Sequence, residues 1–404
     1  QVHEAISSSR FIAISCDYGE RGGRSYASIV VHFLQKGACV ARTLGFLAAG
    51  DESKTAEYIF SQLQDACRPH GLHSQLGKRF VFVSDAGANV LKTGRDFFPM
   101  NVACAAHRLN TWAKRGYFPY AGSASEHLEV AKSAVKIQKT ASTVANYMRS
   151  RKAGFAGYRM PRAYVSTRWL SAAHTMQDIN DILDGLVDSL EADDRSSFAE
   201  SVRFLEFKRE ELTSFGKLMS LFETPVKKLQ SNDCTIGLVV PYVLGIQEGL
   251  EKAANSGTAI EMAFSASLLS AFVEIEKDFF TPLHCAASLL DTRASRMRTH
   301  FSKNQAFLTK CKDDVEEIDS SFAHTTSSRC SSQVLAADAD ATDSILMGED
   351  DAEIRTLRDE IDEYYLTRPS YPNPIEFWTN KLDSMPSLAP LALSILSVPA
   401  TSAQ

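Results

Sequence analysis

The sequence contains no apolar run that approaches the roughly 18–20 residues of a membrane-spanning helix. Its first residues, QVHEAISSSR, include neither the basic nor the apolar stretch of a signal peptide. The phosphate-binding loops G-x-x-x-x-G-K-[ST] and G-x-G-x-x-G are missing, and no serine or cysteine lies in a recognisable nucleophile motif. These absences argue against a membrane protein, a nucleotide hydrolase and a dinucleotide-dependent oxidoreductase, and we expect no small-molecule cofactor.

The sequence also lacks a cysteine framework and an initial methionine. Eight cysteines are scattered over 404 residues, which predicts the reducing interior of a cell rather than secretion. The missing methionine predicts a fragment or a truncated gene product. With 44% hydrophobic and 23% charged residues, the composition is that of an ordinary globular protein, and the length suits two or three domains.

The net charge of −6 is unevenly distributed. The segment Asp313–Glu363 contains 16 acidic and three basic residues, so the rest of the chain is net positive. A concentrated group of basic residues can neutralise DNA or RNA phosphates, and an ordinary solvent-exposed helix face is an equally weighted alternative. The stretch Ala131–Trp169 has no acidic residue and nine basic ones, Lys132, Lys136, Lys139, Arg149, Arg151, Lys152, Arg159, Arg162 and Arg168.

The first 110 residues alternate in the manner of a mixed α/β unit. The order of predicted elements, three strands and then helix–strand–helix–strand, is that of a ribonuclease-H-like sheet, whose first and fourth strands are neighbours. The elements are strands at Arg10–Asp17, Tyr26–Leu34 and Cys39–Phe46, a helix at Ser53–Ala66 capped by Ser53, a strand at Phe80–Val83, a helix from about Ala88, and a strand near Asn101–Ala105.

Beyond residue 110 the apolar period changes to 3.6, which predicts an all-helical insertion domain at residues 111–311. An acidic low-complexity linker is expected at 312–355 and an ordered C-terminal block at 356–404. The predicted helices of the insertion are Glu126–Arg149, Leu170–Leu190, Phe204–Leu229, Val239–Ala253, Ala259–Phe280 and Ala286–Leu308.

Two aspartates follow predicted strands of the α/β unit. Asp17 ends the first strand and Asp85 follows the fourth. Carboxylates at neighbouring strand ends can bridge two cations about 3.5–4 Å apart, as two-metal phosphoryl transfer requires, and we expect these two within about 8 Å of each other. The simpler alternatives are a turn residue at Asp17 and a helix N-cap at Asp85.

Two further motifs have both a functional and a simpler interpretation. Cys104-x-x-His107 could combine with the C-x-x-H-x-x-H run at residues 67–73 to bind zinc, but structural zinc needs four ligands in paired clusters, so this is the minor interpretation. Trp169 could stack on an unpaired base while Arg168 holds the phosphate, and a core tryptophan at a helix start is an equal alternative.

The C-terminal block is very apolar for its length. Such a block must pack on the sheet, on the helical domain or on another copy of itself. The large apolar residues are Phe377, Trp378, Leu382, Leu388, Leu391, Leu393, Ile395 and Leu396.

Six segments, in order and over nearly the whole chain, resemble the hAT superfamily of DNA transposases. No single segment is decisive, but their order makes chance implausible. The segments are ISCDYGERGGRSYASIVVHFL, VSDAGANVLKTG, CAAHRLN, TRWLSAAHTM, LFETPVKKLQSNDCTIGLVVP with the later AASLLDTR, and EYYLTRPSYPNPIEFWTNKLDSMPSLAPLALSILSVPATSA.

The resemblance implies DNA strand transfer that depends on Mg²⁺ or Mn²⁺ and takes place in the nucleus. Asp17 and Asp85 would be the first two catalytic, metal-binding acids, and His107 would point toward them. The implied DNA-binding residues are His107, Lys132, Lys136, Lys139, Arg149, Arg151, Lys152, Arg168 and Trp169. The implied dimerisation residues are Phe377, Trp378, Leu388 and Leu391.

Three features depart from the family pattern. The N-terminal BED-type zinc finger is absent, an expected His-Thr pair appears as Lys54-Thr55, and the third catalytic acid, a Glu after the V-P-A-T-S element, is not reached before Gln404. We therefore expect a protein that binds DNA and self-associates but does not cleave or join strands. A fragment of an active cut-and-paste transposase is the alternative, and another ribonuclease-H-like nuclease is more distant.

Overall fold

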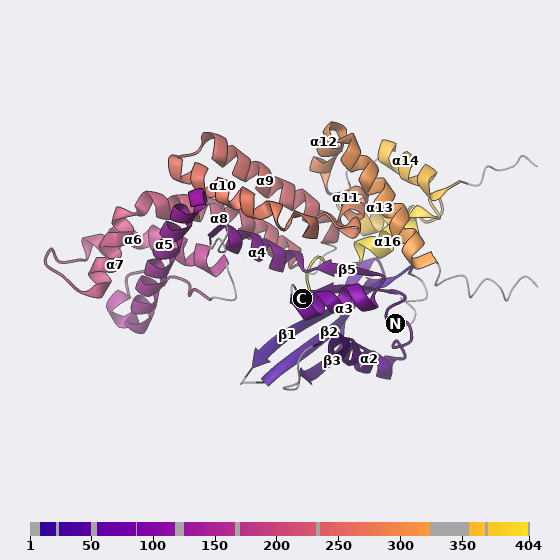
Figure 1. Ribbon diagram of the computed structural model, residues 1–404, viewed down its shortest axis with the longest axis horizontal. Coiled ribbons are helices and arrows are strands. Elements are labelled where there is room, and N and C mark those ends of the chain that lie inside the picture. The colour runs from indigo at the N-terminus through magenta and orange to yellow at the C-terminus, as the bar shows by residue number, and fades with distance from the viewer. Residues whose placement is uncertain are drawn as a thin grey trace, which may run out of the picture. The chain divides into compact units, whose positions relative to one another are not determined.

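The computed structural model forms two compact units (Figure 1). Unit 1 comprises Gln1–Cys104, Leu229–Pro241 and Phe280–Gln404, and unit 2 comprises Ala105–Lys228 and Tyr242–Phe279. The residues that the structure describes are 9–21, 24–49, 55–85, 87–117, 125–165, 170–231, 235–323, 355–367 and 371–402.

Unit 1 is built on a mixed five-stranded sheet with the order β3-β2-β1-β4-β5. The first three strands are antiparallel, while β4 and β5 run parallel to β1, so the first and fourth strands are neighbours, as the sequence predicts. The strands are β1 (Ile12–Arg21), β2 (Arg24–Gln35), β3 (Ala38–Ala49), β4 (Phe80–Ser84) and β5 (Met100–Ala103).

The antiparallel strands are longer than the sequence predicts at one end and end in a tight turn at the other. Lys36 and Gly37, with φ of 51° and 74°, form the two-residue turn of a tight hairpin between β2 and β3. At the other end, β1 stays paired with β2 as far as Arg21. The expectation that Asp17 ends its strand is therefore wrong, because hairpin pairing extends β1 four residues further.

One face of the sheet is covered by α2 (Ala56–Cys67) and α3 (Ala88–Phe97). Alternate residues of β1, including Ile12 and Ile14, point to this face and pack with Leu63. The N-cap of α2 is Thr55, whose hydroxyl accepts the Tyr58 N–H, rather than the predicted Ser53, which lies outside the described residues.

The C-terminal block packs on the sheet domain within unit 1, which is one of the three alternatives that the sequence leaves open. The Arg10 N–H donates to Ser394 Oγ of this block at 3.0 Å. The preceding segment packs there too, since Phe11 stacks on Phe322 with centroids 4.4 Å apart. The helices of this part are α11 (Pro282–Leu290), α12 (Ser295–Lys303), α13 (Gln305–Ala323), α14 (Leu357–Thr367), α15 (Pro374–Thr379) and α16 (Leu388–Leu396).

The first twelve residues of the predicted linker, 312–323, are helical, because they form the second part of α13. The linker prediction is wrong for these residues. Val315, Ile318 and Phe322 are buried at helical spacing, so apolar burial offsets the acidic composition. The rest of the predicted linker, residues 324–354, lies outside the described residues.

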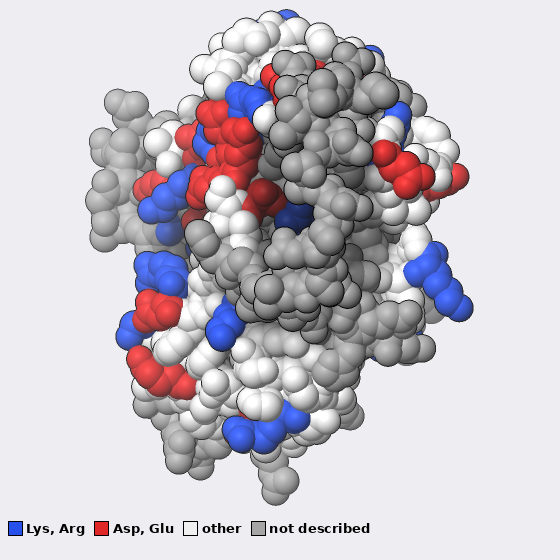
Figure 2. All heavy atoms as spheres, turned by 90° about the vertical axis from the view of Figure 1, so that its right-hand side faces the viewer, with Lys and Arg blue, Asp and Glu red and all other residues white. Residues whose placement is uncertain are grey.

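Acidic side chains gather with basic ones on the side of the molecule shown in Figure 2. The ion pairs between α13 and α14 account for part of this charge, since Arg358 contacts Asp313 and Glu316 at 2.8 and 3.0 Å, and Lys312 contacts Asp362 at 2.6 Å. The charge of the described part of the acidic segment is thus partly neutralised by neighbouring side chains.

Unit 2 is entirely helical over its described residues. Its core surrounds Trp112, whose Nε1–H donates to the Leu268 carbonyl at 2.7 Å and whose ring contacts Phe222 and Phe272. Residues 280–311, expected in this domain, belong to unit 1. The helices are α4 (Ala105–Tyr117), α5 (Ser125–Ser150), α6 (Leu170–Asp188), α7 (Ser197–Phe207), α8 (Arg209–Leu229), α9 (Val239–Ser256) and α10 (Ala259–Val273).

Membrane crossing and the state of the cysteines can both be judged from the described residues. Among the described helices, none is both long and apolar enough to cross a membrane. Cys39 is disulfide-bonded, whereas Cys16, Cys67, Cys104, Cys285 and Cys311 are free and buried.

A buried histidine gives the fold a predicted pH dependence. His284 is fully buried in α11, its Nδ1 lies 2.9 Å from Thr281 Oγ1, and burial lowers its pKa from 6.5 to about 4. Below pH 6.5 the unfolded chain binds a proton that the folded chain does not, so stability falls as the pH drops from 6.5 to about 4. We expect a loss of roughly 3 kcal/mol, measured by urea unfolding at several pH values. The same loss in His284→Leu would assign the effect to other groups.

Candidate carboxylate site and basic helix face

Asp17 and Asp85 belong to neighbouring parallel strands, with Asp17 inside β1 and Asp85 directly after β4. The backbone pairing of β1 with β4 ends at Cys16 opposite Ser84, and the two aspartates are the residues that directly follow this last pair. Neighbouring strands lie about 4.8 Å apart, and both aspartates are half-buried. The sheet therefore brings the backbones of the two acids together, while the predicted separation of their carboxylates stays a prediction.

Asp85 is held by a local turn. Its Oδ1 accepts the Gly87 N–H at 3.0 Å, and a Cβ on Gly87 would lie 3.1 Å from the same oxygen. The alternative of an N-cap at Asp85 is wrong, because Gly87 is the N-cap of α3, and the alternative of a turn residue at Asp17 is wrong because Asp17 lies within β1. The turn fixes one oxygen of Asp85 beside the strand end.

The Cys16 thiol and the Tyr18 phenol lie close enough to these acids for the charges to affect their pKa. Burial, together with the charges of Asp85 and Asp17, raises the pKa of Cys16 to about 12. Burial also raises the pKa of Tyr18, whose hydroxyl donates to Gln62 Oε1 at 3.1 Å. Both groups stay protonated at neutral pH and therefore add no negative charge to this region.

The predicted zinc clusters do not form within the described residues, where no group of three or more His, Cys, Asp or Glu side chains could hold a metal. Cys67 and Cys104 are buried, whereas His70 and His73 are exposed. His107 is exposed on α4 of unit 2. The pair of Asp17 and Asp85 still suits Mg²⁺, which proteins usually bind through one or two carboxylates together with phosphate oxygens.

Three of the predicted DNA-binding lysines share one face of α5. Lys132, Lys136 and Lys139 are exposed and recur after four and three residues, which places them on one side of a helix. Lys132 Nζ contacts Glu129 at 2.7 Å, and Lys136 Nζ lies 4.6 Å from the ring centre of Phe204. Both are surface contacts of little energy. We call this set, Lys132, Lys136 and Lys139, the α5 lysine face.

Other predicted DNA-binding residues have structural partners. Arg149 donates to the Pro161 carbonyl at 2.6 Å and to Asn146 Oδ1 at 2.7 Å, and the Arg151 guanidinium lies 4.1 Å from the ring centre of Tyr147. Lys152 is exposed. Arg168 and Trp169 lie outside the described residues, so their predicted stacking role stays a prediction.

A buried aspartate neutralises two more cations of the basic stretch. Arg162 binds both carboxylate oxygens of Asp178 at 2.8 Å, and Arg159 lies 3.7 Å away. Burial by itself would raise the pKa of Asp178, but the hydrogen bonds from Arg162 outweigh it and hold the pKa below its usual value. These arginines stabilise the fold, and the α5 lysine face is the clearer surface for an anion.

Three of the four predicted dimerisation residues are fully buried inside unit 1. Trp378, Leu388 and Leu391 are 0% exposed, and only Phe377 is partly accessible. Trp378 Nε1–H donates to the Leu290 carbonyl at 2.9 Å. The assignment of the three buried residues to a dimer interface is corrected here, because their surface is already occupied by the fold.

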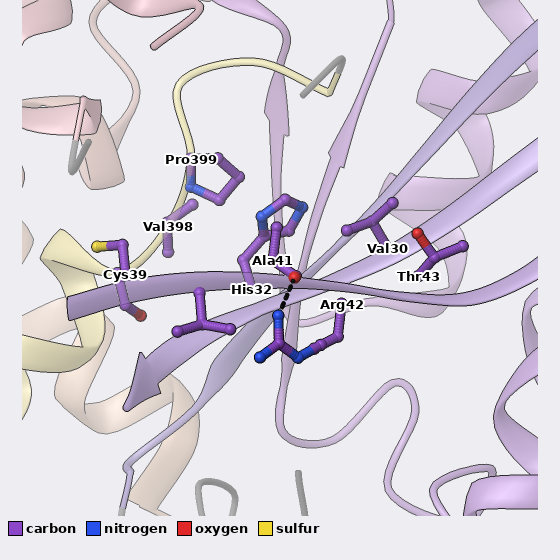
Figure 3. Close-up of a pocket in the computed structure, with 10 residues that line it drawn as sticks. Val30, His32, Cys39, Ala41, Arg42, Thr43, Val398 and Pro399 are labelled. Atoms are coloured by element: carbon purple, nitrogen blue, oxygen red, sulfur yellow. Dashed lines mark hydrogen bonds between the residues drawn. The ribbon is translucent and has the colours of Figure 1, made fainter. Parts of the chain in front are cut away.

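The sequence interpretation missed a pocket of about 380 Å³ beside β3 (Figure 3). It is lined by β2, β3 and the segment that follows α16, which no local motif connects. A contact between residues so far apart in the chain leaves no signal in a single sequence. The lining residues are Val30, His32, Cys39, Val40, Ala41, Arg42, Thr43, Ser397, Val398 and Pro399.

Neither a protein-family model nor a characterised protein matches the sequence significantly.

Proposed function

We propose that this chain is a DNA-binding protein of the hAT-transposase type, with a ribonuclease-H-like sheet and a carboxylate pair that binds a divalent cation. The observation that carries the proposal is the parallel pairing of β1 with β4, from which Asp17 and Asp85 emerge as adjacent residues. The strand order β3-β2-β1-β4-β5, with three antiparallel strands first, supports the same assignment.

Asp17 and Asp85 would bind Mg²⁺ or Mn²⁺ through carboxylate oxygens. When bound, the cation would neutralise and polarise a phosphate group of DNA. The chain contributes the positions of the acids, because the sheet fixes their backbones and the Gly87 N–H orients Asp85. The Cys16 thiol, with its pKa of about 12, stays neutral and adds no competing anion.

The α5 lysine face would bind the DNA backbone. Lysines at this spacing present three cations along one side of the helix, and their present partners are a surface glutamate and a ring face. Phosphates can replace these weak contacts with stronger charge-assisted ones. Contacts of this kind carry no sequence information, so we propose binding without strong sequence preference.

Self-association is a second part of the proposal, with different residues from those first assigned. Trp378, Leu388 and Leu391 are internal, but Leu366 on α14 is 83% exposed and Leu382 is 39% exposed. These apolar side chains belong to the same C-terminal block. We propose that they contribute to contacts between copies of the chain.

DNA binding is tested by fluorescence anisotropy with a labelled 30-base-pair duplex at increasing salt. Three phosphate contacts predict that the association constant falls roughly 40-fold between 50 and 200 mM salt. Binding that does not change with salt would contradict the assignment to lysine–phosphate contacts.

A strand-cleavage assay with Mg²⁺ or Mn²⁺ separates the proposal from its enzymatic alternative. We expect no cleavage, because the described residues around Asp17 and Asp85 include no third carboxylate, cysteine or histidine that would complete a metal-binding group. Robust cleavage by the chain, abolished by Asp85→Asn, would support an active transposase instead.

A further inference from the structure

Strand β3 forms an edge of the sheet over the described residues, and its side chains leave that edge accessible. It is twelve residues long, and Ala41, Arg42 and Thr43 in its centre are exposed. Phe46 is 67% exposed and stacks on Tyr26 with centroids 5.2 Å apart. An edge strand of this length and composition offers a row of backbone hydrogen-bonding groups to another extended chain.

The pocket described above follows this edge. Ala41 and Thr43 lie on one face of β3 because they pair with His32 and Val30, whereas Val40 and Arg42 alternate to the other face. Both sets line the pocket, so it extends around the edge of the strand. Figure 3 shows Val398 and Pro399 on the opposite side of β3 from Arg42.

The two sides of the pocket differ in chemistry. On the Ala41 side, the apolar residues Val30, Val398 and Pro399 line the pocket together with the polar residues His32 and Thr43. On the other side, Arg42 is the one charged residue of β3, and its Nη1 donates to the Ala41 carbonyl at 3.2 Å. Among the described residues, Arg42 forms no ion pair with an acidic side chain.

We propose that β3 binds an extended peptide that adds to the sheet as a further strand. Its backbone would pair with β3, and its side chains would alternate between the two sides of the pocket. An apolar side chain of the peptide would pack against Val398 and Pro399, and an acidic side chain would lie beside Arg42. The preferred ligand is therefore a segment in which apolar and acidic residues alternate.

Charge complementarity favours this ligand over a second copy of β3. Two copies paired antiparallel around Arg42 would bring two guanidinium groups close together, and like charges directly across a strand pair are destabilising. An acidic peptide meets no such repulsion. Pairing between copies is thus an outcome of the test rather than the proposal.

The probe is a fluorescein-labelled decapeptide of alternating valine and aspartate, measured by anisotropy with the whole chain and no DNA. We expect binding that weakens roughly fivefold or more in Arg42→Glu. A decapeptide of alternating valine and lysine should show the reverse preference. Lys36→Glu, in the turn that precedes β3, makes the same charge change outside the strand and outside the pocket lining and should leave binding unaltered.

A third peptide tests the backbone pairing without changing the protein. The valine–aspartate peptide with N-methyl groups on alternate amides cannot donate the same hydrogen bonds, and we expect it to lose binding. Equal binding of the N-methylated and the unmethylated valine–aspartate peptides would overturn the proposal. Equal effects of Arg42→Glu and Lys36→Glu would overturn it as well. A dimer in sedimentation velocity that Arg42→Glu dissociates and the peptide leaves intact would assign the edge to a second copy.

Discussion

Reversing the charge of the α5 lysine face is expected to remove most DNA affinity. The triple variant Lys132→Glu, Lys136→Glu and Lys139→Glu loses three phosphate contacts and adds three negative charges. At 100 mM salt we expect the dissociation constant to rise on the order of 100-fold or more, and the salt dependence to become shallower by about three in its logarithmic slope. Anisotropy titrations with the labelled duplex, repeated at several salt concentrations, measure both quantities.

A matched control separates a local surface from the total charge of unit 2. Lys228, Lys252 and Lys277 are exposed lysines of the same unit, and changing all three to Glu alters the net charge by the same amount. This control should keep most of its affinity. Equal losses in the two triple variants would mean that DNA responds only to the overall charge, and the α5 assignment would be wrong.

Truncating Trp378 is expected to destabilise unit 1 strongly. The side chain is 0% exposed, its ring centroid lies 4.6 Å from that of Tyr364, and its N–H binds the Leu290 carbonyl. Trp378→Ala should therefore cost about 3–5 kcal/mol, a large part of the roughly 5–15 kcal/mol that stabilises a typical domain. Urea unfolding followed by circular dichroism measures the loss.

Trp378→Phe is the informative control. It keeps an aromatic ring, and the Tyr364 hydroxyl, which lies 3.2 Å from the Leu289 carbonyl and 3.3 Å from the Leu290 carbonyl, can still donate to the latter. We expect a much smaller loss for this variant. If Trp378→Ala kept its stability but became monomeric in sedimentation velocity, the residue would belong to an interface between copies, as the family resemblance implies.

Much of the fold follows from local sequence patterns. The predicted helix at Glu126–Arg149 corresponds closely to α5 because its apolar residues recur at helical spacing and are buried. The predicted helix at Ala286–Leu308 fails, because the chain bends at Asp291 and continues as α12 and α13. The buried Asp291 carboxylate binds Arg293 two residues later at 2.7 Å, and this local contact leaves no mark on the apolar period.

Composition alone gives a wrong prediction where an acidic segment also has apolar residues at helical spacing. The acidic run after Lys312 predicts disorder, yet Phe322 inserts against Phe11, more than 300 residues earlier in the sequence. The partner that makes the helix favourable is thus invisible to local analysis. The same reason explains the missed pocket, since Val398 and Ala41 line it from opposite ends of the chain.

The candidate site was predictable in part. A carboxylate after each of two apolar strands indicated Asp17 and Asp85, and the strand order indicated that their strands are neighbours. The exposure of each basic residue could not be predicted, because Arg162 and Lys139 have the same charge but Arg162 binds the buried Asp178. Burial of Trp378 was equally hidden, since an apolar block can cover its own domain or a second copy.

The central claim, that Asp17 and Asp85 form a divalent-cation site, is tested most directly by Mn²⁺ titration. Electron paramagnetic resonance measures the free Mn²⁺ in the presence of the whole chain, of Asp17→Asn, of Asp85→Asn and of Asp65→Asn, an exposed control on α2. The account predicts saturable binding that each site variant weakens at least roughly tenfold, while Asp65→Asn binds like the unaltered chain. Unchanged Mn²⁺ binding in both Asp17→Asn and Asp85→Asn would contradict it.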